Sequence, residues 1–111
     1  MKIAELLAAK GVHLSCEVFP PKEFARVEEV KTVVRDIAAL KPAYVSVTYG
    51  AAGRTPHFTR EMAQTVEASG VPALAHLTCI NDTVSKIGDV LAGLEEGGIA
   101  NVLALRGDIP E

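Results

Sequence analysis

The sequence predicts an α/β protein whose parallel strands and crossover helices form part of a (β/α)8 barrel, and three observations support this. First, four short apolar runs with the two-residue repeat of strands alternate with segments whose apolar residues recur every three or four positions. Second, glycine or proline follows most of these segments, and no low-complexity stretch interrupts them. Third, polar residues collect near the C-terminal end of each predicted strand. This alternation indicates a βαβαβαβ order with right-handed crossovers.

Each predicted element has a sequence signal at its ends. A small helix comes first and is followed by Gly11, and Pro20-Pro21 ends the first strand because proline has no amide hydrogen for a ladder bond. Thr55-Pro56 is typical of an N-cap followed by proline, and Asn81-Asp82 is expected to cap the last helix. The expected helices are 2–10, 23–40, 56–68 and 82–96, and the expected strands are 13–19, 43–49, 72–79 and 101–106.

The apolar stripes of the predicted helices indicate which faces are buried. We expect these stripes to pack against the sheet, with charged residues turned outward. The stripes are Ile3, Leu6 and Leu7; Val27, Val30, Val34 and Ile37; Phe58, Met62 and Val66; and Val84, Ile87, Leu91 and Leu94.

The polar residues near the strand ends share one parity within each strand. A barrel wall, with helices outside and a polar site inside its upper mouth, fits this pattern. An open sheet with helices on both faces would leave so many polar groups harder to satisfy, so the pattern favours the barrel. The polar residues are Ser15 and Glu17, Ser46 and Thr48, His76 and Thr78, and Arg106 and Asp108, with Tyr49 at the end of the second strand. The apolar parity includes Leu14, Cys16 and Val18 in the first strand and Leu103 and Leu105 in the fourth.

The composition indicates one soluble globular unit. The chain has 111 residues, 49% of them hydrophobic, and a formal charge of −3. The charge is mildly acidic and not clustered, so nothing in it indicates a nucleic-acid footprint or a polybasic membrane surface. No apolar run is long enough to span a bilayer, and the N-terminus has no cleavable signal pattern. Cys16 and Cys79 lie in apolar runs and are interpreted as reduced core residues of a cytoplasmic protein, with a disulfide or metal pair as the alternative.

Glu17 is central to the functional interpretation. A carboxylate in an apolar strand is costly to bury as an anion, so Glu17 is paired in a salt bridge, protonated or used in chemistry. A metal site from Glu17, His76 and Asp108 is chemically possible, but the HxxE or HxH spacings that would support it are missing. His76 as a hydrogen-bonded core residue, and Arg106 with Asp108 as a local ion pair, are further structural interpretations. A dinucleotide-binding open sheet is excluded, because Pro20-Pro21-Lys22 stands where G-x-G-x-x-G would follow the first strand.

Four motifs resemble those of the methylenetetrahydrofolate reductase family, in order and over nearly the whole chain. Residues 15–22, Ser-Cys-Glu-Val-Phe-Pro-Pro-Lys, resemble the family opening S-x-E-F-F-P-P-K. The segments 46–51, 75–79 and 103–108 are similar to the family motifs of the second, third and fourth strands. Any one of these matches alone is weak evidence for the resemblance, whereas four matches in the same order are strong evidence.

The resemblance implies a (β/α)8 TIM barrel that holds FAD non-covalently at the C-terminal ends of its strands. The reaction implied is NAD(P)H-dependent reduction of the folate 5,10-methylenetetrahydrofolate to 5-methyltetrahydrofolate, in the one-carbon metabolism that supplies methionine. By position, Glu17 takes the role of catalytic general acid and contacts the folate. Asp108 is also implied to contact the folate. A carboxyl held among Cys16, Val18 and Phe19 would gain proton affinity by desolvation. The cofactor-binding positions implied are Thr48, Tyr49, Ala51, His76, Arg106, Gly107 and Asp108, and no metal is implied.

Two departures from the family pattern bear on the prediction. The loop after the second strand reads Gly-Ala-Ala-Gly-Arg-Thr over residues 50–55, where the family usually has G-A-G-G-S-T. The second departure is length, because a (β/α)8 barrel takes about 250 residues. We therefore expect residues 1–111 to be the N-terminal half of the barrel domain, with strands one to four and without the C-terminal half. This half is expected to be inactive alone, and the full-length enzyme is expected to be a homo-oligomer.

Two alternatives stay open at this point. The first is a non-catalytic half-barrel that assembles with a partner polypeptide. The second is a metal-dependent TIM-barrel lyase or hydrolase that uses Glu17, His76 and Asp108.

Overall fold

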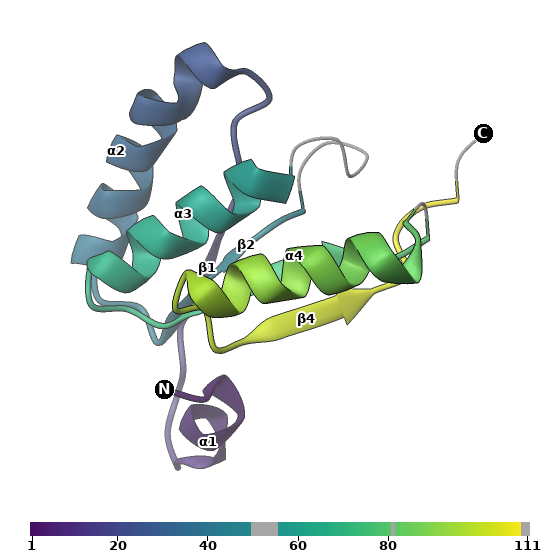
Figure 1. Cartoon of the computed structure of the whole chain (residues 1–111). Helices are drawn as coiled ribbons and strands as arrows, with labels where there is room; N and C mark the ends of the chain where they lie inside the picture. Colours follow the sequence, from purple (N-terminus) through teal and green to yellow (C-terminus); the bar gives the residue numbers. More distant parts are fainter. Residues whose placement is uncertain (50–55, 81, 110–111) are drawn as a thin grey trace.

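The computed structural model describes residues 1–49, 56–80 and 82–109. Its element order confirms the predicted βαβαβαβ arrangement after a small helix (Figure 1). The elements are α1 (Ile3–Ala8), β1 (Ser15–Val18), the 3₁₀ turn η1 (Phe24–Arg26), α2 (Val27–Ala39), β2 (Tyr44–Val47), α3 (Pro56–Ala68), β3 (Ala73–Thr78), α4 (Val84–Glu96) and β4 (Val102–Leu105).

The four strands form one parallel sheet in the order β1-β2-β3-β4, so each strand pairs with its neighbour in the sequence. Helices α2, α3 and α4 all lie on one face of this sheet (Figure 1). A doubly wound sheet would place crossover helices on both faces. The structure is therefore an α/β fold with the arrangement of the first half of a (β/α)8 barrel.

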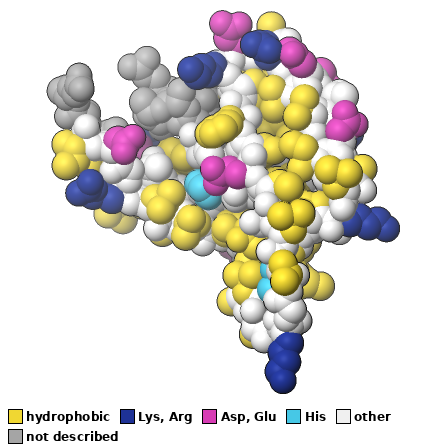
Figure 2. Space-filling view, turned by 180° about the vertical axis from the view of Figure 1, so that it is seen from behind, with side chains coloured by type: hydrophobic (Ala, Val, Ile, Leu, Met, Phe, Trp, Pro, Cys, Tyr) yellow, Lys and Arg dark blue, Asp and Glu magenta, His cyan; other side chains and the backbone are white. Residues whose placement is uncertain are grey.

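The apolar core lies between the sheet and these helices. The alternation predicted for the first three strands is confirmed, because Val18, Val45 and Ala75 are buried on the helix side. Helix α3 contributes most to the core, and its predicted stripe of Phe58, Met62 and Val66 is buried. From α2, Val27 and Val34 are buried and Val30 and Ile37 pack against the core. The opposite face of the sheet has exposed hydrophobic side chains (Figure 2).

The first residues of the chain do not follow the predicted pattern fully. Helix α1 lies apart from the other helices (Figure 1), and Leu7 and Leu14 are exposed although both were predicted to be on apolar faces. The helix is held by Asn101, whose Oδ1 accepts from the Ile3 amide over 2.9 Å and whose Nδ2 donates to the Met1 carbonyl over 2.9 Å. A buried polar side chain thus anchors the helix, rather than an apolar stripe.

The fourth strand corrects one prediction about faces. In the register, Ala75 pairs with Val102 and His76 pairs with Leu103. Paired residues of neighbouring strands point to the same side of a sheet, so Leu103 and Leu105 share the face of His76. The prediction that they lie on the helix side is wrong. The phase was inferred from Arg106 and Asp108, which lie beyond the end of the strand.

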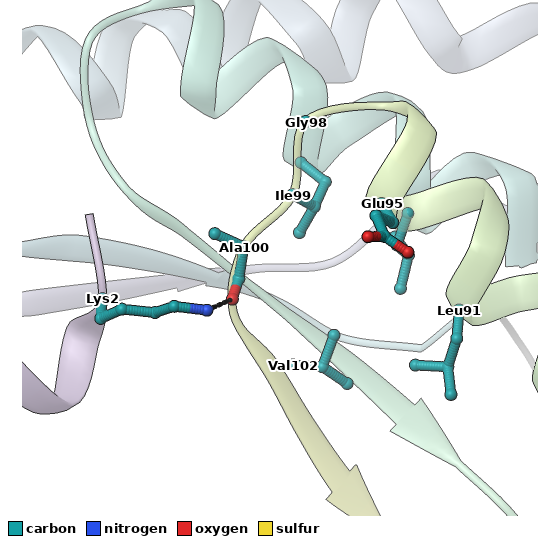
Figure 3. Close-up of a pocket in the computed structure, with 8 residues that line it drawn as sticks. Lys2, Leu91, Glu95, Gly98, Ile99, Ala100 and Val102 are labelled. Atoms are coloured by element: carbon teal, nitrogen blue, oxygen red, sulfur yellow. Dashed lines mark hydrogen bonds between the residues drawn. The ribbon is translucent and has the colours of Figure 1, made fainter.

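Helix α4 also differs from the prediction. It begins at Val84 rather than at residue 82, and its N-cap is Thr83, whose Oγ1 accepts from the Lys86 amide over 3.1 Å. Of the predicted stripe, Leu94 is buried, whereas Val84 is 89% exposed and Leu91 is exposed. Leu91 lines an open hollow of about 500 Å³ between α4 and β4, together with Lys2, Leu94, Glu95, Gly98, Ile99, Ala100 and Val102 (Figure 3). Among the helices of the described ranges, none is long and apolar enough to cross a membrane.

Candidate functional site

Three polar side chains meet on the face of the sheet opposite the helices. Glu17 and Ser46 are paired in the register of β1 and β2, and the Ser46 hydroxyl donates to Oε1 of Glu17 over 3.0 Å. Nε2 of His76 on β3 lies 3.6 Å from the same oxygen. A histidine lies beside an acidic side chain near the middle of this face, with hydrophobic side chains around them (Figure 2). The predicted site residues Glu17 and His76 are therefore neighbours, and Ser46 joins them.

The Glu17 side chain is 50% exposed, whereas that of His76 is 13% exposed. The expectation that Cys16, Val18 and Phe19 surround the carboxyl group is wrong. Cys16 and Val18 alternate to the helix side, where they contact the core, and Phe19 is itself exposed. Glu17 is thus open to solvent or a ligand and is held by a neighbouring hydroxyl.

The two oxygens of Glu17 have different surroundings. Oε1 accepts from Ser46 and faces His76, whereas Oε2 has no hydrogen bond or ion pair among residues 1–49, 56–80 and 82–109. A half-exposed carboxyl group with one oxygen held by a hydroxyl and the other without a partner in the described ranges can exchange a proton with a ligand on this face.

Thr48 lies one residue beyond the paired Val47 and Ala75, so it lies next to His76 on the same face. Its backbone is fixed on two sides. The Thr48 amide donates to the Val18 carbonyl over 3.1 Å, and the Thr48 carbonyl accepts from Oγ1 of Thr59 on α3 over 3.0 Å. Thr48 therefore joins the cluster through the register of the strands.

Tyr49 lies at the end of β2 and points toward the loop before α4. Its hydroxyl donates to Oδ2 of Asp82 over 3.2 Å. Burial raises the pKa of Tyr49 to about 12, and the charge of Asp82 and the hydrogen bond to it add to this. The sequence indicated Asp82 only as a capping residue, so its link to Tyr49 was missed. No sequence pattern joins two residues that meet only when strands pair.

The predicted residues after β4 occupy the end of the outer strand. The Arg106 carbonyl accepts from the Ile80 amide over 2.8 Å, and Gly107 has a φ of +87°. A Cβ added at Gly107 would lie 3.0 Å from Cβ of Thr78, so β3 and β4 approach closely here. Arg106 and Asp108 are both exposed and, within the described ranges, form no ion pair with each other.

Within the described ranges, Asp108 forms no hydrogen bond or ion pair with Glu17, Ser46 or His76. It follows β4, which is three strand spacings from β1, or about 14 Å across the sheet. Ala51 and the rest of the loop over residues 50–55 lie outside the described residues. Among those that are described, no group of three or more His, Cys, Asp or Glu side chains is arranged to hold a metal ion. The alternative of a metal centre from Glu17, His76 and Asp108 therefore has no ligand set in the structure.

The chain was compared with known proteins. A family model described as methylenetetrahydrofolate reductase matches residues 2–111. The 5,10-methylenetetrahydrofolate reductase of Pectobacterium carotovorum subsp. carotovorum is 35% identical over 101 residues, which are 90% of this chain and 34% of the relative. The methylenetetrahydrofolate reductase (NADH) 1 of Zea mays is 39% identical over a gapped alignment of 115 positions, which covers 99% of this chain and 19% of the relative. The protein of the same name in Arabidopsis thaliana is 38% identical over 110 residues, 98% of this chain and 19% of the relative.

Proposed function

The chain belongs to the methylenetetrahydrofolate reductase family, and from this premise we propose that it contributes the proton-donating side of an FAD-dependent reduction of 5,10-methylenetetrahydrofolate to 5-methyltetrahydrofolate. The chain spans about a third of the bacterial relative and about a fifth of the plant relatives it matches. The observation that carries the proposal is Glu17, held by Ser46 beside His76 on the open face of a half-barrel sheet. The plant relatives are named as NADH enzymes, which supports a nicotinamide as hydride donor.

Glu17 is the proposed general acid. Ser46 occupies Oε1, so the transferable proton resides on Oε2, the oxygen that Ser46 does not contact. In the proposed reaction this proton passes to a ring nitrogen of the folate as the five-membered ring opens and the one-carbon unit becomes an iminium that accepts hydride. The partial exposure of Glu17 allows the substrate to reach the carboxyl group directly.

FAD, when bound, would supply the carrier that accepts hydride from the nicotinamide and delivers it to the folate. The open face suits such a group, because polar Thr48 and His76 lie beside apolar Leu103 and Leu105 on one side of the sheet. A flat heteroaromatic ring needs apolar contact for its faces and hydrogen-bond partners at its edge. We propose that these residues hold the ring, with Tyr49, Ala51 and the segment Arg106, Gly107 and Asp108 contributing at the strand ends and Asp108 also meeting the folate.

We further propose a cytoplasmic location, one-carbon metabolism leading to methionine as the context, and a homo-oligomeric state for an enzyme that contains this segment. Cys16 and Cys79 are free thiols, which suits a reducing compartment.

A chimeric enzyme tests the proposal. Residues 2–111 would replace the matching segment of the Pectobacterium carotovorum reductase, and the two half-reactions would be followed separately. We expect bound FAD, rapid reduction of FAD by NADH, and reoxidation by 5,10-methylenetetrahydrofolate. Glu17→Gln should slow the folate half-reaction about 10²- to 10⁴-fold, the usual contribution of a general acid, and leave the NADH half-reaction unchanged.

The matched control is Glu5→Gln, which removes an exposed acid on α1 far from the sheet face. It should leave both half-reactions unchanged. A folded chimera that binds FAD but reduces the folate equally well with Glu17→Gln would rule out the proposed role of Glu17.

A further inference from the structure

A side-chain hydrogen bond links the end of β2 to the loop between β3 and α4, and the proposed proton transfer does not use it. The Tyr49 hydroxyl donates to Oδ2 of Asp82 over 3.2 Å. The other oxygen, Oδ1, lies 3.0 Å from Nζ of Lys86 in the first turn of α4. The Asp82 side chain is only 3% exposed, so it is a buried carboxylate with a partner on each oxygen.

The loop that carries Asp82 is itself attached to two further strands. The Asp82 amide donates to the Cys79 carbonyl over 3.2 Å, and the Ile80 amide donates to the Arg106 carbonyl over 2.8 Å. The ends of β3 and β4 therefore fix the backbone on which Asp82 sits. Through Asp82, the aromatic ring of Tyr49 is attached to this same frame.

A capping role does not account for Asp82. Thr83 is the N-cap of α4, because its Oγ1 accepts from the Lys86 amide over 3.1 Å. The Asp82 carboxylate is directed instead toward Tyr49 and the ammonium group of Lys86. The side chain thus serves a contact between elements.

We propose that Asp82 is a positioning residue that fixes the Tyr49 ring at the C-terminal edge of the sheet. This inference rests on the proposed function, in which Tyr49 is one of the flavin-binding residues. Because the only hydroxyl proton of Tyr49 is directed to Asp82, a ligand beside it meets the ring and the lone pairs of the oxygen. The ligand group that Tyr49 receives is therefore an aromatic face or a hydrogen-bond donor, and Tyr49 does not protonate it.

The surroundings keep the Tyr49 hydroxyl protonated over the whole neutral range. Burial, the negative charge of Asp82, the hydrogen bond to it and nearby Cys79 together raise the pKa of Tyr49 to about 12. The charge and the acceptor oxygen of Asp82 both favour the neutral hydroxyl. Removing Asp82 should therefore lower the pKa of Tyr49, while burial keeps it above the ordinary value.

The chain is well suited to a spectroscopic test, because it has two tyrosines, Tyr44 and Tyr49, and no tryptophan. Near-ultraviolet circular dichroism reports how firmly the rings are held, and absorbance during alkaline titration reports their ionisation. We expect Asp82→Ala to remove as much tyrosine dichroism as Tyr49→Phe removes, and to remove no more in the Tyr49→Phe background. The ionisation step near pH 12 should move to lower pH.

Two further variants complete the experiment. Asp82→Asn keeps an acceptor oxygen and the side-chain size but not the charge. It should therefore lower the pH at which Tyr49 ionises and retain the tyrosine dichroism. This variant tests the inference if Asp82→Ala does not fold. Asp89→Asn, which changes an exposed acid on α4, should change neither signal. Unchanged dichroism and titration in folded Asp82 variants would overturn the inference. Failure of the folded chimeric reductase to bind FAD would count against the proposed function only, because neither tyrosine signal needs the flavin.

Discussion

At the scale of single residues, the proposed chemistry depends on how Glu17 is oriented. Ser46 is buried in the middle of β2 and donates to Oε1 of Glu17, whereas the Glu17 side chain is half exposed. An exposed carboxylate without this donor would rotate among several conformers. The hydroxyl of Ser46 thus holds Oε1 and, in the proposed reaction, leaves Oε2 for the substrate.

We expect Ser46→Ala in the chimeric reductase to slow the folate half-reaction about 10- to 100-fold, because a misplaced catalytic group loses its near-attack geometry. The NADH half-reaction should be unaffected. Ser46→Thr keeps the hydroxyl in a β-branched side chain that suits a strand, and it should restore most of the rate. Ser15→Ala, which removes an exposed hydroxyl from the same strand as Glu17, serves as the control. Equal rates in Ser46→Ala and wild type would show that the hydrogen bond has no catalytic importance.

Gly107 offers a test of the close approach between β3 and β4. Its φ is +87°, and an added Cβ would lie 3.0 Å from Cβ of Thr78. Gly70 has nearly the same φ, +86°, but nothing within 4 Å of an added Cβ. Gly70→Ala should therefore lower the free energy of unfolding by about 1–2 kcal/mol, the strain of the left-handed conformation. Gly107→Ala should lower the free energy of unfolding further, because its added Cβ also meets Thr78. Urea unfolding of both variants measures the difference. Equal losses of free energy would contradict the close approach of β3 and β4.

The residue scale also shows what alternation in the sequence can and cannot determine. In β1 the polar Ser15 and Glu17 alternate with Cys16 and Val18, so the pattern determines the two faces, and the structure agrees. All four residues of β4, Val102–Leu105, are apolar, so alternation gives no phase there. The polar residues that suggested a phase, Arg106 and Asp108, lie after the strand, on either side of Gly107 with its positive φ.

At the scale of elements, the start of α4 shows how tertiary contacts select among equivalent local signals. Asn81, Asp82 and Thr83 are all good N-cap residues, and the sequence alone favoured the first two. In the structure Thr83 is the cap, while the Asp82 carboxylate is engaged by Tyr49 and Lys86. The sequence predicts the helix correctly because the apolar repeat is a local signal. It misplaces the first residue because Asp82 contacts Tyr49, which is distant in the sequence.

Helix α1 offers a test at the scale of elements. Six residues are too few for a stable isolated helix, and only Ile3 of α1 is buried. Asn101 fixes it by accepting from the Ile3 amide and donating to the Met1 carbonyl, with a longer bond to the Ala73 carbonyl at 3.4 Å. Asn101→Ala should lower the free energy of unfolding by about 1–3 kcal/mol, since it leaves buried backbone groups unpaired. Amide exchange should accelerate at Ile3.

The control for α1 is Lys2→Ala. The Lys2 ammonium donates to the Ala100 carbonyl over 3.2 Å at the exposed rim of the same junction. Its removal should change the unfolding free energy much less, because water replaces the lost bond. Slow amide exchange at Ile3 in Asn101→Ala would show that α1 is held by other contacts.

At the scale of the whole molecule, the sheet is covered on one face only. Helices α2, α3 and α4 bury the helix side (Figure 1), while the other side has the Glu17 cluster next to exposed Leu103 and Leu105. The outer strands are β1 and β4, and within the described ranges each has unpaired backbone groups along its outer side. Edges of this kind pair readily with another chain.

We therefore expect the purified 111-residue chain to self-associate through its outer strands, so that sedimentation velocity shows species larger than the 11.7 kDa monomer. Because all strands are parallel, β4 of one copy can continue the sheet in the same sense by pairing with β1 of another copy. Leu105→Lys puts a charge on the outer strand and should shift the population toward monomer. Leu7→Lys alters a similarly exposed leucine on α1, away from the sheet, and should leave the assembly unchanged. A wild-type chain that sediments as a single monomer at high concentration would show that these edges are protected.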